Sequence, residues 1–229
     1  VKFVGELGTE ALAAMGAGSR VFFALQAIMM AISAGTTALV ARAWGAGDYE
    51  EASRVTMASM VLAGLLSLLI AVFGIVLASD MAGVFGLDEA TSDLATRTIQ
   101  WLSFFNLAFA VAFVLQAALR ASGDAWTPLW VGIGCNIINL PLFYAFIFGN
   151  WGAPNMGVVG SAVAGGISFA AGSLFMLIMW LRQRFRVRYI NHGWWRRERL
   201  ARLLQIGYPA ALEQGVFQIG FFIFLILIG

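Results

Sequence analysis

The sequence has almost none of the side chains on which enzyme chemistry depends. It contains one histidine, His192, and one cysteine, Cys135. A single histidine in an arginine-rich segment provides neither a histidine pair for a metal nor a charge-backed catalytic triad. A lone cysteine allows no internal disulfide, and no Gly-x-x-x-x-Gly-Lys sequence is present to bind ATP phosphates. We therefore predict that the chain is not an enzyme and holds no metal or organic cofactor.

Charge is absent from a long stretch of the chain. Residues 125–181 contain no Asp, Glu, Lys or Arg over 57 positions. A bilayer core needs about 20 apolar residues per helix, so this stretch is long enough for two spans. The turn-rich residues 149–155 lie between them. The chain as a whole is 11% charged, against roughly 25% in soluble domains. These features indicate an integral membrane protein whose first partner is the lipid bilayer.

Hydropathy predicts an all-α polytopic bundle. Five complete spans are expected, near residues 19–40, 55–79, 98–119, 130–148 and 158–181, and a further span begins at Ile206. Strands of a membrane barrel are excluded, because they would be about 10 residues long with alternating polarity. Residues 1–8 are typical of the tail of a helix, and the last residues lie within an apolar run. We expect the chain to be part of a longer protein.

The basic residues divide unevenly between the two sides of the predicted bundle. Of the 14 Lys and Arg residues, 11 fall on one side, and eight of these lie in residues 182–202. Positive residues favour the cytoplasmic side, so we expect this segment to be cytoplasmic in a multi-pass protein of the plasma or inner membrane. Its arginines and Trp194–Trp195 pair do not indicate nucleic-acid binding, since membrane anchoring alone produces such a loop.

Five short motifs follow one another at the ends of the predicted spans. They are LGTEALAA at 7–14, AGTTALVARAWGAGD at 34–48, LRASGDAWTP at 119–128, NIINLPLFYAFIFG at 136–149 and GVVGSAVA at 157–164. In this order they resemble the multidrug and toxic compound extrusion (MATE) family of efflux antiporters. Residues 206–214 resemble the opening of that family's second lobe. The resemblance extends over nearly the whole chain.

The resemblance implies an architecture and a function. Residues 1–181 would form the N-terminal six-helix lobe with helix 1 truncated, so that they hold the end of helix 1 and helices 2–6. Residues 182–204 would be the connector between lobes, and residues 205–229 would be helix 7, with the rest of the second lobe missing from this chain. The protein would export cationic or amphipathic small molecules in exchange for H⁺ or Na⁺, by alternating access between two lobes.

Several motif residues are interpreted as structural. A glycine after a helix supplies a left-handed cap, which we expect of Gly45 or Gly47. Arg120 is expected either to hold the turn at Gly123 through Asp124 or to contact a lipid phosphate. The small residues Gly160, Ala164, Ser168 and Gly172 recur every four positions, as in closely packed membrane helices.

The segment around Asn136 and Asn139 is the first candidate for a substrate or ion pathway. These asparagines are three residues apart, on one helical face, and Pro141 frees a nearby backbone carbonyl. Tyr144 belongs to the same segment. The alternative is that both asparagines only hydrogen-bond to neighbouring helices. Some family members carry an acidic or amide residue four positions after the asparagine that aligns with Asn139, but this chain has Phe143.

Glu213 is the one acidic residue within a predicted span, four residues after Pro209. A carboxylate in such a place can exchange a proton for Na⁺ or for a cationic substrate. The alternatives are an interfacial position or an ion pair with an arginine of the connector. Further polar candidates for the pathway are Gln26, Asn106, Gln116, Gln214 and Gln218.

Two other functions compete with efflux. A flippase for lipid-linked or polysaccharide precursors would need cationic residues facing the cavity, whereas the candidates here are neutral or acidic. A non-transporting membrane scaffold would need neither Glu213 nor a polar helix containing Pro141. Both features favour the transporter.

Overall fold

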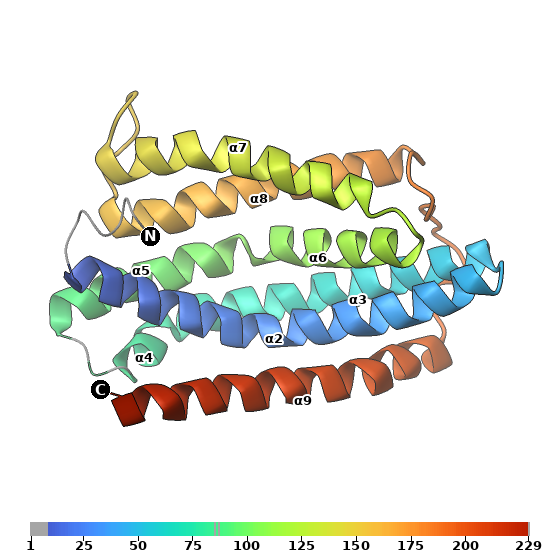
Figure 1. Cartoon of the computed structure of the whole chain (residues 1–229), viewed down its shortest axis with the longest axis horizontal. Coiled ribbons are helices and arrows are strands. Elements are labelled where there is room, and N and C mark those ends of the chain that lie inside the picture. The colour runs from blue at the N-terminus through green and yellow to red at the C-terminus, as the bar shows by residue number, and fades with distance from the viewer. Residues whose placement is uncertain (1–8, 85, 87, 229) are drawn as a thin grey trace.

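The computed structural model describes residues 9–84, 86 and 88–228, apart from the side chains of residues 9–12, 218, 219 and 221–228. These residues form eight helices and no strand. Their bounds are α2 Thr9–Gly45, α3 Tyr49–Val76, α4 Ala78–Gly83, α5 Glu89–Phe104, α6 Asn106–Ala121, α7 Trp126–Phe148, α8 Gly157–Leu181 and α9 Arg197–Ile228. The long helices lie side by side, with the α7–α8 hairpin on one side of the bundle and α9 on the other (Figure 1).

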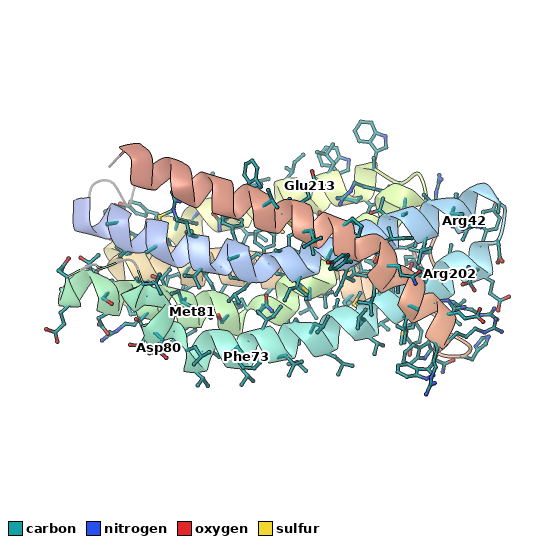
Figure 2. The ribbon with its side chains drawn as sticks, turned by 90° about the horizontal axis from the view of Figure 1, so that it is seen from below. Arg42, Phe73, Asp80, Met81, Arg202 and Glu213 are labelled. Carbon is teal, nitrogen blue, oxygen red and sulfur yellow. The ribbon has the colours of Figure 1, made fainter. Side chains whose placement is uncertain are left out.

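The five complete predicted membrane spans coincide with long helices. Length and composition allow α2, α3, α7 and α8 each to cross a membrane, and α5 with α6 to form a fifth, bent span. Large apolar side chains on the outer faces stay exposed, as in Phe73, which is 56% exposed on α3 (Figure 2). An apolar surface of this kind is suited to lipid rather than water.

One predicted span is broken in the structure. The segment expected as a single helix over residues 98–119 begins earlier, at Glu89, and bends by 50° between α5 and α6 at Phe105. The polar residues 89–97 lower the local hydropathy, which hides the first turns of α5. The ring of Phe105 lies where a side chain at Gly166 of α8 would otherwise be, so the bend fits against a glycine.

The last helix also begins before the predicted boundary. Hydropathy places its start at Ile206, but α9 runs without interruption from Arg197. The arginines of its first turns lie at the connector end, and Figure 2 shows Arg42 of α2 and Arg202 of α9 close to that end. The connector therefore includes the first part of a helix as well as a loop.

The connector packs against the ends of the helices instead of projecting away from them. Phe185 and Val187 are buried in a core cluster with Leu39, Val55 and Trp180. The backbone N–H of Arg188 donates to the Ser53 hydroxyl at 3.0 Å, and Arg186 Nη1 donates to the Ser122 carbonyl at 3.4 Å. Residues far apart in the sequence thus meet at one end of the bundle.

A buried ion pair fixes the start of α9 to α3. The Arg199 side chain is 4% exposed and donates through Nε and Nη2 to the two carboxylate oxygens of Glu51, at 2.8 and 2.6 Å. Its Nη1 also donates to the carbonyls of Gly193 and Trp194. One guanidinium group therefore joins the connector loop to two helices, and bidentate geometry makes this a strong contact.

The expected tight turns are present, but one expected contact is wrong. Gly47 and Gly123 have φ angles of +76° and +82°, which glycine adopts at little cost. Asp124 does not bind Arg120: its carboxylate accepts from the Thr127 N–H at 3.0 Å and the Thr127 hydroxyl at 2.6 Å. Arg120 donates instead to Gln116, one helical turn earlier. The residue before α7, Ala125, has no side chain that can cap the helix. The Asp124 carboxylate therefore accepts hydrogen bonds at the helix start instead.

Candidate functional site

A largely apolar cavity with several polar side chains in its lining lies between α6, α7 and α8, with a volume of about 400 Å³. Three of the predicted pathway residues line it: Gln116 from α6 and Asn136 and Asn139 from α7. Helix α8 adds the hydroxyls of Ser168 and Ser173. We call this space the amide cavity.

Close packing of α7 on α8 forms two of the cavity walls. A Cβ atom on Gly160 would lie 2.5 Å from the Phe146 carbonyl oxygen, so the two backbones meet there because glycine has no side chain. A Cβ on Gly172 would overlap the Cys135 sulfur. The left-handed Gly149, at φ +71°, ends α7 and lets α8 return along it. The packing expected for the small-residue stripe is confirmed.

The amide groups in the cavity retain unused acceptors. Asn139 Nδ2 donates to the Ser168 hydroxyl at 3.3 Å, and that hydroxyl donates to the Ala164 carbonyl at 2.8 Å. Asn136 Nδ2 donates to the Gly132 carbonyl of its own helix at 2.9 Å. Within the described part of the chain, neither asparagine oxygen accepts a hydrogen bond, so both are available to a ligand.

The lining residues limit what the cavity can bind. Amide and hydroxyl oxygens coordinate hard cations and accept hydrogen bonds. The rings of Phe143 and Phe169 also line the cavity, and aromatic faces attract organic cations. No Asp, Glu, His, Lys or Arg is among the described lining residues. The amide cavity can therefore hold a cation, but a carboxylate for proton exchange must come from elsewhere.

Tyr144 lies apart from the two asparagines, and Pro141 does not interrupt α7. Tyr144 does not line the amide cavity, and its ring lies 5.5 Å from Phe148 and 5.9 Å from Trp151, measured between centroids. Four residues beyond Pro141, α7 is still helical, so the proline removes one backbone donor without breaking the helix.

Gln26 and Asn106 form a separate, fully buried group. Gln26 Nε2 donates to Asn106 Oδ1 at 2.7 Å, and Asn106 Nδ2 donates to the Ser67 carbonyl at 2.9 Å. Their exposed fractions are 2% and 0%. This core amide pair links α2, α3 and α6 beside the bend at Phe105. Residue 67 takes part through its backbone carbonyl, so no side-chain pattern in the sequence reveals it.

The candidates on α9 lie apart from the amide cavity. Glu213 is exposed, forms no ion pair among the described residues, and lies midway along α9 (Figure 2). Gln214 is half-buried, and the side chain of Gln218 lies outside the described residues. In the described part of the chain, helix α9 contacts α2 and α3 but neither α7 nor α8.

The sequence is similar to a family of membrane proteins and to several of its individual members. The sequence model of the MatE family matches residues 1–145. The chain is 29% identical over 226 residues to the probable multidrug resistance protein NorM of Thermotoga maritima, with 97% of this chain and 48% of NorM aligned. It is 28% identical over 215 residues to the probable multidrug resistance protein YoeA of Bacillus subtilis, with 90% and 46% aligned.

The fold is similar to solved transporter structures. An outward-facing multidrug resistance MATE family transporter of the MOP superfamily aligns with a TM-score of 0.89 at 27% identity, over 96% of this chain and 48% of that one. A MATE structure in complex with MaD3S aligns with a TM-score of 0.88 over 96% and 49%. This chain spans about half the length of the curated relatives that it matches.

Proposed function

The chain belongs to the MATE family, and on this premise we propose that it forms one lobe of an antiporter that exports organic cations or other xenobiotics. Residues 1–181 would provide the N-terminal lobe, residues 182–204 the connector, and residues 205–229 the first helix of a second lobe. The two lobes would alternate between openings to either side of the membrane, driven by inward H⁺ or Na⁺. The connector would face the cytoplasm.

The observation that carries this proposal is the amide cavity. Polar side chains within a membrane are costly, and those facing a cavity commonly mark the path of a substrate or ion. Here three amides converge from α6 and α7, while two aromatic rings supply an apolar wall. This combination suits the charged group and the apolar body of an amphipathic cation.

Glu213 is the proposed exchange group. Its carboxylate is exposed and has no ionic partner among the described residues, which supports a role on a face of α9 that would turn toward the second lobe. A coupling ion and a cationic substrate would compete for it, each favouring one arrangement of the lobes. The flippase alternative is less well supported, because the described lining of the amide cavity has no Lys or Arg to hold a pyrophosphate.

The test uses the complete protein, in cells whose own efflux pumps have been deleted. We expect Glu213→Gln to abolish ion-driven efflux of a cationic dye while the protein remains folded and inserted. Asn139→Ala should weaken efflux less, about tenfold, since it removes one hydrogen-bonding group worth about 1.5 kcal/mol. Glu198→Gln, an acidic residue in the first turn of the same helix, is the matched control and should leave efflux unchanged.

Two results would count against the assignment. Normal efflux by Glu213→Gln would make Glu213 structural and move the coupling site to another helix. Normal efflux by Asn139→Ala and by Asn136→Ala, with dye affinity unchanged, would remove the amide cavity from the pathway.

A further inference from the structure

A second hollow lies on α7 and α8, nearer the connector end of the bundle. It has a volume of about 750 Å³ and shares only the wall formed by Val131, Cys135 and Gly172 with the amide cavity. Its floor is apolar and includes Gly134, Ile138, Ala171 and Phe175. We call it the interfacial groove.

The groove changes character along its length. At the connector end it is lined by Arg184 and Arg186, followed by Trp126 and Trp130 at the start of α7. The two tryptophans are four residues apart on one helical face and are 69% and 64% exposed. Exposed tryptophans with basic residues beside them are typical of the membrane–water interface. The arginines therefore lie at headgroup depth, and the apolar floor extends toward the acyl chains.

The positive charge of the groove is not neutralised by the chain itself. Asp124 is the one acidic residue among the described lining residues, and Thr127 donates to both of its carboxylate oxygens. No ion pair within the described chain involves Arg184 or Arg186. Arg186 spends one Nη1 donor on the Ser122 carbonyl, at the long distance of 3.4 Å. Both arginines are exposed, so most of their guanidinium donors remain free to bind phosphate oxygens.

We propose that the interfacial groove binds an anionic phospholipid from the leaflet on the connector side. The lipid phosphate would be held by Arg184 and Arg186, and one acyl chain would lie along the floor between Gly134 and Phe175. Basic pockets between membrane helices are known to select such headgroups. A Cβ atom added to Gly134 would meet nothing within 4 Å, so the floor there is open to a chain. This site is distinct from the proposed transport pathway and does not depend on it.

The charge test uses the complete protein reconstituted in phosphatidylcholine vesicles with a trace of spin-labelled phosphatidylglycerol. Electron paramagnetic resonance measures how strongly the labelled lipid is retained, relative to labelled phosphatidylcholine. We expect Arg184→Ala with Arg186→Ala to reduce this preference by about fivefold per arginine, which corresponds to ~1 kcal/mol for one charge at a membrane surface. The matched control, Arg182→Ala with Arg188→Ala, removes the same charge from the same connector and should leave most of the preference intact.

A steric test separates the groove from general surface attraction. Gly134→Leu should occupy the floor and lower retention of phosphatidylglycerol, whereas Gly64→Leu on α3, equally free of close neighbours, should not. Soluble glycerol phosphate should not compete, because it has no chain for the floor. An unchanged preference in the Arg184/Arg186 variant, an equal loss in the control pair, an unaffected Gly134→Leu variant, or effective competition by glycerol phosphate would each overturn the proposal.

Discussion

At the scale of single residues, the core amide pair consists of two fully buried polar side chains. Gln26 and Asn106 satisfy each other and the Ser67 carbonyl, yet Gln26 Oε1 is buried without a partner among the described residues. Buried polar groups without partners cost free energy, so their presence requires compensation. The hydrogen bond between Gln26 and Asn106 offsets part of this cost, because it joins α2 to α6 next to the bend between α5 and α6.

We expect a double-mutant cycle at this pair to show coupling. Asn106→Leu should destabilise the protein by about 1–3 kcal/mol, because it leaves the Gln26 amide buried and unsatisfied. Gln26→Leu with Asn106→Leu should cost less than the sum of the two single changes, with a coupling of about 0.6–2 kcal/mol. Unfolding of the complete protein in mixed micelles measures both quantities. Strict additivity would mean that the two amides do not stabilise each other.

At the scale of helices, glycine positions control how closely α7 and α8 approach. Gly160 and Gly165 lie on the same helix, five residues apart, but only Gly160 abuts the backbone of α7. A Cβ atom added to Gly165 would have Asn139 Nδ2 as its nearest neighbour, at 3.9 Å. The two sites therefore differ in packing while sharing the same helical environment.

This difference predicts opposite effects of the same substitution. Gly160→Ala should destabilise the protein by about 1–3 kcal/mol, because the Phe146 carbonyl cannot move without displacing α7. Gly165→Ala should be neutral or stabilise by about 0.5–1 kcal/mol, since alanine favours the helix. Thermal unfolding in detergent compares the two variants. Equal stability would show that the α7–α8 contact is looser than described.

The connector offers a second prediction at this scale. Glu51→Ala leaves the buried Arg199 without its anionic partner, so residues 190–198 should detach and trypsin should cleave at Arg196 or Arg197 much faster. The control is Asp93→Ala, whose carboxylate is 58% exposed and pairs with Arg97 at the surface, away from the connector. Such surface pairs contribute about 0–1 kcal/mol. Similar cleavage rates in both variants would contradict the anchoring role of Arg199.

The sequence predicts the long helices well and their interruptions poorly. Charge-free runs locate α7 and α8 to within a few residues, because lipid exposure imposes a continuous apolar surface. The bend at Phe105 is not visible in the same way, since it depends on a glycine of α8 and an amide of α2, both distant in sequence. The start of α9 is hidden for another reason: arginines in its first turns are paired or solvated and lower the hydropathy.

In the candidate site, too, some features are predicted by the sequence and others are not. The helical spacing of Asn136 and Asn139 correctly places both on the cavity side of α7, and Gln116 joins them from α6. Tyr144, in the same segment, lies outside this cavity and contacts Phe148 and Trp151 instead, which the sequence does not reveal. Arg120 and Asp124 are close in sequence, but helix capping at Thr127 takes the carboxylate.

At the scale of the whole molecule, charge is arranged along the long axis of the bundle. The arginine-rich connector covers the end where α2, α6 and α8 finish and α3, α7 and α9 begin. The opposite end holds Asp80, Asp88, Glu89 and Asp93. A membrane protein with this asymmetry is expected to insert in a single orientation.

Orientation can be tested by cysteine labelling in the complete protein, after Cys135→Ser removes the native thiol. We expect His192→Cys in the connector to react only from the cytoplasmic side, and Ala90→Cys in the first turn of α5 only from the opposite side. Both positions are exposed, and neither has a positive φ angle that would strain a cysteine. Labelling of both from one side would refute the number of spans and the orientation.

The tie between Arg199 and Glu51 has a mechanical consequence. It lies at one end of α9, and two close backbone approaches between α9 and α2, at Gly35 and Gly207, lie within a few turns of it. From Arg199 to Ile228 the helix is about 44 Å long at ~1.5 Å per residue. A tilt of roughly 10° about the tied end would carry the other end through about 8 Å at that length. A slight rotation of α9 about the Arg199 contact would therefore become a wide displacement at the opposite end of the helix.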